Sequence, residues 1–258
     1  MAARAMWKGV IQCADVEIPV KLYAAVEDQR VPFRMLNRKD QSPVRQSMVH
    51  PVTGKTVPHE RTRRAYIAES GHRVILSAAE LKALEPEESR DIEILAFVPP
   101  AELDHRWYER PYYLGPDASS KQYFALTEAL EKSGLEGVAR WVMRGRQYRG
   151  ALRLHEGYPV LMSLRNAAEV IPADALPAPG GPALDARELD MARQLIGMLS
   201  ADLDLSAYHD EYRGRVEELL QTKARGGRLK LVKPRRKAPI DDLSQALQAS
   251  LKAARKAA

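Results

Sequence analysis

Residues 7–23 read WKGVIQCADVEIPVKLY, and this stretch decides the fold of the N-terminal part of the chain. Its second half, residues 18–23, alternates in part between apolar and polar side chains, which is typical of a half-buried β-strand. Pro19 has no N–H to donate to a strand ladder, so it marks a strand start or a sheet edge. The stretch therefore predicts β-strands.

Strand patterns recur outward from this stretch as far as residue 165. Strands are predicted over residues 65–67, 74–76, 92–98, 112–114 and within 138–165. In the last of these regions, residues 157–159 (Gly-Tyr-Pro) are predicted to form the turn between two strands.

Two helices interrupt the strands. Ser77 and Glu80 match the S-x-x-E capping box, in which each side chain satisfies an unpaired backbone N–H, so a short helix is predicted over residues 77–84. A second helix is predicted over residues 119–134, because its apolar side chains recur at helical spacing.

A helical region follows the proline- and glycine-rich residues 178–183, which are predicted to be a linker. Two helices are predicted there, and both carry a wide apolar stripe that ends before Gly226. Such a stripe needs a partner, and the pattern favours packing on the chain's own strands and packing on another subunit equally. The stripe includes Leu189, Ile196, Leu199, Tyr208 and Tyr212.

The order of these elements predicts an α+β protein that is mainly β: a β-barrel core with an α-helical arm. The expected divisions are a core over residues 1–177, with an extended segment at about 31–66, a linker over 178–183, a helical arm over 184–226 and a basic tail over 227–258. The tail ends in a short amphipathic segment with leucines at positions 243, 247 and 251.

Positive charge is concentrated in three stretches of the chain. Residues 30–73 carry a net charge of +7, residues 138–165 carry +5 and residues 221–258 carry +9, whereas the whole chain is only +6. Since the three stretches total +21, the remaining residues carry −15. This segregation is typical of surfaces that bind a polyanion.

The sequence also bounds the compartment. With Cys13 as its single cysteine, the chain can form neither an intrachain disulfide nor a cysteine-based zinc site, which suits a reducing compartment. No apolar run approaches the ~18 residues of a membrane span. The first residues are not followed by an apolar run long enough for a signal peptide. We therefore expect a cytoplasmic protein without membrane contact.

No motif for catalysis or for metal binding emerges. Residues 54–56 (Gly-Lys-Thr) match the end of a phosphate-binding loop, but Val49 stands where that loop requires its first glycine. The six histidines form no H-x-x-x-H pair. His209 is predicted to lie on a solvated helix face. We expect that the protein is not an enzyme and holds no metal.

The basic residues give the stronger functional signal. A solvated charged loop would explain any single one of them, but ten basic residues with three acids in residues 30–73 repel one another unless an anion lies against them. No aromatic RNP motif accompanies them, so the pattern favours backbone contact with a duplex over base stacking on a single strand. The candidate DNA-binding residues are Arg34, Arg38, Lys39, Arg45, Lys55, Arg61, Arg63, Arg64, Arg144, Arg146 and Arg149.

Five motifs, in order along residues 6–225, resemble those of bacterial Ku, the DNA-end-binding protein of non-homologous end joining. They are W-K-G-x-I at 7–11 with I-P-V-K-L-Y at 18–23, G-K-x-V at 54–57 with Glu60 and Tyr66, E-R-P-Y-Y-L-x-P at 109–116, E-L-x-M-A-x-Q-L-I at 188–196, and Y-H-D-E-Y at 208–212. Five motifs in the family's order are far more specific than any one of them alone.

The resemblance implies a Ku-type β-barrel in a homodimer that closes a ring around double-stranded DNA, with no cofactor. Residues 34–64 would be the bridge over the duplex, and the turn at 144–149 would face the DNA. The arm at 184–225 would belong to the helical part of the dimer. Its interface would include Leu189, Ile196, Leu199, Tyr208 and Tyr212.

The last segment, residues 240–251, resembles the family's short C-terminal motif. The resemblance implies that this motif recruits the ATP-dependent DNA ligase of the pathway, ligase D, and the residues it would use are Leu243, Leu247 and Leu251. A nucleoid-associated location in the cytoplasm follows from DNA as the partner.

Two other classes of protein stay open at this point. A structural nucleoid protein that coats DNA without needing ends would explain the basic stretches, but it gives no reason for the helical arm. A DNA-processing enzyme such as a nuclease or lyase would need clustered carboxylates or an activated lysine, and neither spacing occurs in the sequence.

Overall fold

The structure is a computed structural model that describes residues 4–117, 120–178, 180–181, 185–227 and 243–257. The chain divides into two compact units. One comprises residues 1–29 and 34–175, and the other comprises residues 30–33 and 176–258. Each unit is described by itself.

The first unit is built on a closed β-barrel of seven strands in the order β1-β2-β6-β9-β8-β7-β5. These strands are β1 (Trp7–Cys13), β2 (Val16–Ala24), β5 (Asp91–Val98), β6 (Tyr108–Pro116), β7 (Glu136–Met143), β8 (Arg146–His155) and β9 (Tyr158–Leu164). Neighbouring strands are antiparallel except β1 and β5, which pair in parallel and close the barrel. The predicted β-barrel class is confirmed.

The opening stretch forms the hairpin of β1 and β2, with register from Trp7↔Leu22 to Cys13↔Val16. Apolar side chains alternate along β2, where Ile18 and Val20 are 2% and 0% exposed. β2 pairs with β6 from Val20 onward, and the Pro19 carbonyl accepts from Asp117 N at 3.1 Å just past the end of β6, so Pro19 lies at the end of that ladder. This is the position that a residue without an N–H tolerates.

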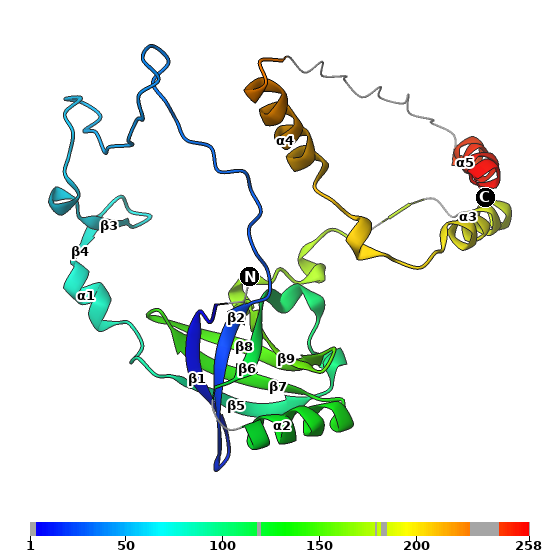
Figure 1. Ribbon diagram of the computed structural model, residues 1–258, viewed down its shortest axis with the longest axis horizontal. Helices are drawn as coiled ribbons and strands as arrows, with labels where there is room; N and C mark the ends of the chain where they lie inside the picture. The colour runs from blue at the N-terminus through cyan, green and yellow to red at the C-terminus, as the bar shows by residue number, and fades with distance from the viewer. Residues whose placement is uncertain (1–3, 118–119, 179, 182–184, 228–242, 258) are drawn as a thin grey trace. The chain divides into compact units, whose positions relative to one another are not determined.

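The core of the barrel is apolar and aromatic. Helix α2 (Ser120–Ser133), which lies below the barrel in Figure 1, packs against β2 and β8. From α2, Tyr123 donates a hydrogen bond to the Leu114 carbonyl at 2.7 Å, and Leu130 is 3% exposed. Trp141 stacks on Tyr148 at 5.4 Å between ring centroids. Burying each large apolar side chain of this kind stabilises the fold by roughly 1.5–3 kcal/mol.

Between β2 and β5 the chain forms small local elements. They are the 3-10 helix η1 (His59–Arg61), the hairpin of β3 (Arg64–Ile67) and β4 (Arg73–Leu76), and helix α1 (Ala78–Ala83). The predicted capping box of α1 is confirmed: Ser77 Oγ accepts from Glu80 N at 3.1 Å, and Glu80 Oε2 accepts from Ser77 N at 2.8 Å. Neither strand of the β3–β4 hairpin has a buried residue.

Short 3-10 turns connect the remaining elements. They are η2 (Pro100–Glu102), η3 (His105–Trp107), η4 (Ala167–Glu169), η5 (Ala173–Ala175) and, in the second unit, η6 (Leu205–Ala207).

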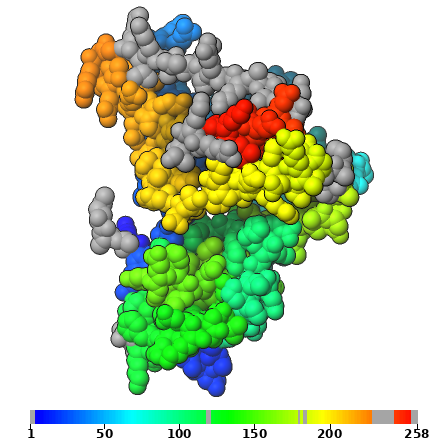
Figure 2. All heavy atoms as spheres, turned by 90° about the vertical axis from the view of Figure 1, so that its right-hand side faces the viewer, coloured from blue at the N-terminus to red at the C-terminus, as the bar shows by residue number. Residues whose placement is uncertain are grey.

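The second unit is helical, with α3 (Ala186–Leu199), α4 (Glu211–Ala224) and α5 (Leu243–Ala257). Asp185 caps α3 by accepting hydrogen bonds from the backbone N–H groups of its first turn. α4 ends next to Gly226, whose φ of +77° is the left-handed conformation that glycine adopts readily. α5 packs against α3, which Figures 1 and 2 both show.

Two local predictions are wrong. Tyr208 lies before α4 and not on it, because Asp210 caps the helix by accepting from Arg213 N at 3.0 Å. The predicted turn at residues 157–159 lies at Glu156 and Gly157 instead, both with positive φ, and Tyr158 already pairs with His155. The strand predicted at residues 112–114 is confirmed, and it is longer than predicted because it is part of β6.

Candidate nucleic-acid interface

The predicted DNA-binding residues fall into two sets. Eight lie in residues 34–64, which we call the basic segment, and three lie on or beside β8 at the β7–β8 turn, which we call the arginine hairpin (Arg144, Arg146 and Arg149). All eleven side chains are exposed, and within the described part of the chain none of them forms an ion pair. Each set therefore offers uncompensated positive charge to solvent.

The basic segment is shaped by turns and not by a core, since none of its side chains is buried. Around Asn37 the chain folds back through an antiparallel bridge of Leu36 with Pro43. The side-chain oxygen of Asn37 accepts from Lys39 N at 3.0 Å, and its carbonyl accepts from Gln41 N at 2.9 Å. The turn places Lys39 at an exposed tip.

Asp40 is an acidic residue within this turn, and its carboxylate accepts hydrogen bonds from Ser42. The backbone N–H of Ser42 donates to its carboxylate at 3.1 Å, and the Ser42 hydroxyl donates at 2.9 Å. These two hydrogen bonds, the backbone one first, hold the pKa of Asp40 below its usual value. The carboxylate is thus engaged locally and does not pair with Lys39 or Arg38.

A second turn precedes Lys55. His50 Nδ1 accepts from the backbone N–H groups of Val52 and Thr53 at 3.2 and 3.3 Å, and the chain reverses through Gly54 at a φ of +66°. The reversal is closed by a hydrogen bond from His50 N to the Lys55 carbonyl at 2.9 Å. The glycine that resembles part of a phosphate loop in sequence is therefore the left-handed residue of a tight turn.

The arginine hairpin is a two-residue β-turn. Arg144 and Gly145 both have positive φ, 55° and 69°, which is the signature of a type I′ turn between twisted strands. Across the hairpin Arg149 is the register partner of Arg140. Arg140 Nε donates to Glu93 Oε2 at 3.0 Å, so its charge is neutralised, whereas that of Arg149 is not. Like charges opposite each other destabilise a strand pair, and Glu93 relieves that here.

The barrel does compensate basic side chains elsewhere. Lys8 and Lys21 share Asp117, at 3.0 and 2.8 Å, which lowers the pKa of that carboxyl. Arg153 pairs with the buried Glu136 at 3.3 Å. The absence of partners in the two basic sets is therefore not a general property of this surface.

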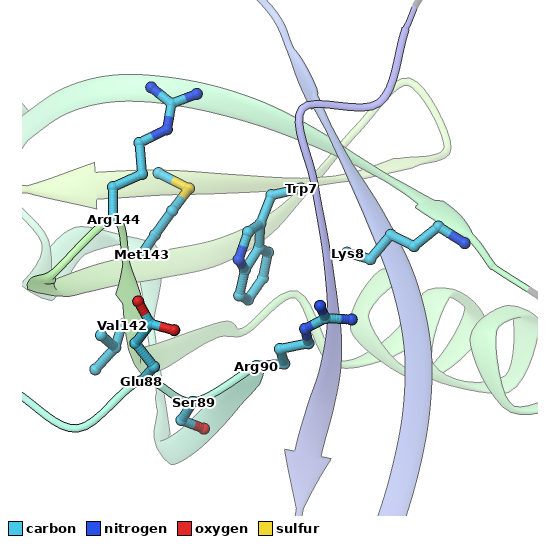
Figure 3. A pocket seen from close by; sticks show the side chains of 8 residues that line it. All are labelled: Trp7, Lys8, Glu88, Ser89, Arg90, Val142, Met143 and Arg144. Atoms are coloured by element: carbon cyan, nitrogen blue, oxygen red, sulfur yellow. The ribbon is translucent and has the colours of Figure 1, made fainter.

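A pocket of about 530 Å³ adjoins the arginine hairpin and adds a basic residue that the sequence did not single out. Figure 3 shows its lining, which includes Trp7, Glu88, Arg90 and Arg144, with Lys8 pointing away from the other labelled side chains. Arg90 is exposed, and its carbonyl accepts from Val10 N at 2.9 Å, which fixes its backbone to β1. Counting charges along the sequence does not single out Arg90, because its place beside the arginine hairpin depends on this contact with β1.

Residues 63 and 64 approach the arginine hairpin through a shared neighbour. Arg63, Arg64 and Glu85 line a second pocket, of about 880 Å³. The carboxylate of Glu85 also lies against Gly145, where an added Cβ would stand 3.1 Å from Glu85 Oε2. The end of the basic segment and the tip of the hairpin thus border the same acidic residue.

The predicted interface and recruitment residues lie in the helical unit. All five predicted dimer residues are exposed: Leu189 40%, Ile196 68%, Leu199 66%, Tyr208 73% and Tyr212 69%. Of the predicted ligase-recruitment residues, Leu243 is 48% exposed, Leu247 is half-buried and Leu251 is 8% exposed.

Two other kinds of feature are missing from the described residues. No group of three or more His, Cys, Asp or Glu side chains that could hold a metal ion occurs among them. In the same part of the chain, no helix combines the length and the apolar character needed to cross a bilayer.

Known proteins match this chain along most of its length. A family model described as the Ku70/Ku80 beta-barrel domain matches residues 12–191. The protein named non-homologous end joining protein Ku 2 of Geotalea uraniireducens (strain Rf4) is 36% identical over 254 residues, which cover 98% of this chain and 99% of that protein.

Two further relatives carry the name non-homologous end joining protein Ku. The one from Coxiella burnetii (strain RSA 331 / Henzerling II) is 33% identical and covers 97% of this chain and 95% of its own length. The one from Mycobacterium tuberculosis (strain CDC 1551 / Oshkosh) is 31% identical and covers 98% of this chain and 97% of its own length. Both the basic segment and the arginine hairpin fall within the matched residues.

Proposed function

The chain belongs to the Ku family, and from this premise we propose that it forms a homodimeric ring that threads onto double-stranded DNA ends without sequence preference. In this proposal the ring recruits the ATP-dependent end-joining ligase, ligase D, to double-strand breaks. It is a passive clamp associated with the nucleoid in the cytoplasm. It has no catalytic residues and needs no cofactor.

One observation carries the DNA-binding part of the proposal. Eleven exposed basic side chains in two sets have no ion-pair partner within the described residues, although the barrel pairs Lys21 and Arg153 nearby. Side chains of this kind bind phosphate oxygens and release counterions when they do so. Phosphates are the same at every base pair, so contacts to them position the protein without reading sequence.

End specificity would then come from topology. A closed ring cannot enter a duplex that has no end, whereas an open phosphate-binding surface can bind anywhere along it. Exposed apolar side chains of the helical unit, such as Ile196 on α3 and Tyr212 on α4, support the closure, because two copies would bury them. The β3–β4 hairpin, with no buried residue, likewise needs a partner surface, since isolated two-stranded sheets are marginal in water.

The test compares binding to a linear duplex and to a covalently closed circle of the same sequence. We expect the linear duplex to bind and the circle to compete poorly. Equal binding to both would favour a nucleoid-type protein that coats DNA without ends, and cleavage of either DNA would favour an enzyme.

Reversing two charges tests whether the basic segment contributes to duplex binding. Arg63→Glu with Arg64→Glu should weaken binding of the linear duplex, because two phosphate contacts become repulsive. The matched control is Lys132→Glu on α2, an exposed lysine that pairs with Glu128 and lies outside both basic sets. Equal affinity of the two variants would remove the basic segment from the proposed interface.

A further inference from the structure

The C-terminal helix α5 is docked on α3, and the contact uses a defined face of each helix. α5 is apolar along a row of leucines spaced by four residues, and the C-terminal leucine of that row, Leu251, is 8% exposed. On α3, Met191 is 9% exposed, and Ala192 and Leu195 are half-buried. Figures 1 and 2 show the two helices side by side, and the two helices are in contact.

The buried face of α3 does not include Leu189 and Ile196, which are two of the residues predicted for the dimer interface. At 3.6 residues per turn, Met191, Ala192 and Leu195 lie on one side of the helix. Leu189 and Ile196 lie about a quarter turn away, 40% and 68% exposed. The wide apolar stripe that the sequence predicts is therefore only partly buried. Leu189 and Ile196 stay exposed beside the buried face, and Leu199, one turn beyond Leu195 on the same side, is 66% exposed.

An isolated helix of 15 residues is marginal in water, because nucleation is costly and each further hydrogen bond adds little. The contact with α3 supplies the apolar burial that holds α5 helical. The two leucines of this row that are buried or half-buried, Leu251 and Leu247, are among those through which, under the proposed function, α5 recruits the ligase. An amphipathic helix presents one apolar face to one groove at a time.

We propose that α3 and the ligase compete for one leucine row of α5, so that α5 must leave its dock on α3 before it recruits. This inference rests on the proposed recruitment role. It makes the face of Met191, Ala192 and Leu195 an internal docking site whose occupant is the chain's own C-terminal helix. The apparent affinity for the ligase is then lowered by the fraction of chains in which α5 is docked.

The test uses the full chain and three variants. Leu195→Glu places a charge in the proposed docking site on α3 and leaves the sequence of α5 unchanged. Leu247→Glu places the same charge in the leucine row. Gln194→Glu is the matched control, since it adds one negative charge to the next, exposed position of α3 at the loss of a hydrogen bond to Asp190.

Hydrogen exchange of the α5 amides measures whether α5 is docked on α3, and it needs no ligase. We expect slow exchange of the α5 amides in the wild type and in Gln194→Glu, and fast exchange in Leu195→Glu and Leu247→Glu, with the barrel strands unchanged in all four. Fast exchange of α5 in the wild type, or protection that survives Leu195→Glu, overturns the docking.

The affinity of each variant for ligase D then tests whether α3 and the ligase compete for α5. Leu195→Glu should bind ligase D roughly three- to tenfold more tightly than the wild type, because it frees α5, and Leu247→Glu should lose binding. If all four proteins bind the ligase equally, recruitment through this row and the competition are both wrong. If Leu247→Glu alone loses binding while Leu195→Glu equals the wild type, recruitment stands and the competition is wrong. If none binds, the recruitment role itself fails, and hydrogen exchange still decides the docking.

Discussion

A buried carboxylate lies at the start of β7. Glu136 is 2% exposed; it accepts a hydrogen bond from the Tyr108 hydroxyl at 2.9 Å and pairs with Arg153 Nε at 3.3 Å. The Arg153 guanidinium also lies over the Tyr108 ring, 5.8 Å from its centroid. Burying a charge is costly unless its partners are in place, so the three side chains stabilise the barrel as a unit.

Glu136→Ala should therefore destabilise the protein by about 2–4 kcal/mol, because it leaves the Tyr108 hydroxyl and the Arg153 charge without their shared partner. The matched control is Glu93→Ala, which removes a half-exposed carboxylate from Arg140 on the same sheet and should cost less than about 1 kcal/mol. Urea unfolding followed by tryptophan fluorescence measures both. Equal losses would mean that burial does not set the value of these pairs.

The same group gives the barrel a sensitivity to alkaline pH. Burial first, and then the hydrogen bond to Glu136, raise the pKa of Tyr108 from 10.0 to about 12. A folded-state pKa above the unfolded one means that the stabilisation is complete below pH 10 and is lost as pH rises through about 12. Tyr108→Phe should lose stability less steeply across that window, as measured by unfolding at a series of pH values. The exposed Tyr66→Phe serves as the control and should follow the wild type.

At the scale of elements, the arginine hairpin predicts a specific salt dependence. Changing its three arginines to glutamine should reduce the slope of log K against log salt by roughly 0.9 for each phosphate contact removed. The thermal midpoint should stay nearly constant, since in the described part of the chain none of the three has an ion-pair partner to lose. Gel-shift titrations at several salt concentrations measure the slope. An unchanged slope with lower affinity would indicate that the hairpin shapes the site without touching phosphate.

Helices and strands whose signals lie within a few residues of sequence could be predicted from the sequence. The capping box at Ser77 and Glu80 and the strand alternation along residues 18–23 are local signals, and the structure confirms both. The parallel pairing of β1 with β5 is not local: it joins Ile11 to Ile92, and nothing in either strand encodes the other. The basic candidates were predictable because charge is read directly from sequence, whereas Arg90 joined them only through the packing of its backbone on β1.

The contact between α3 and α5 is a second example of packing between distant segments that the sequence alone does not predict. Each apolar stripe was visible in sequence, but a stripe specifies burial without naming its partner. Leu251 was expected to face a ligase, and in the structure it is buried in a unit whose helices are α3, α4 and α5. That Met191 is buried while Ile196 of the same stripe stays exposed follows only from the positions of both helices.

At the scale of the whole molecule, the proposed DNA contacts and the proposed ring closure use different compact units. The basic segment and the arginine hairpin belong to the first compact unit, and the exposed side chains of Ile196 and Leu199 belong to the second. Salt acts on these two surfaces in opposite ways. It screens phosphate contacts, whereas it leaves apolar association intact or strengthens it. The proposed ring closure and the proposed DNA contact should therefore respond differently to salt.

Trapping on DNA is the prediction that follows. The protein is loaded on a linear duplex, both ends are then blocked with a bulky protein, and the salt is raised. We expect release from the open duplex, where a ring slides off an end once its phosphate contacts weaken, and retention on the blocked duplex, where only opening of the ring would free it. Ile196→Glu with Leu199→Glu, which places charges in the proposed closure, should be released from both, while Lys132→Glu should behave as the wild type. Release of the wild type from blocked DNA as fast as from open DNA would show that the protein holds the duplex by surface contact and does not encircle it.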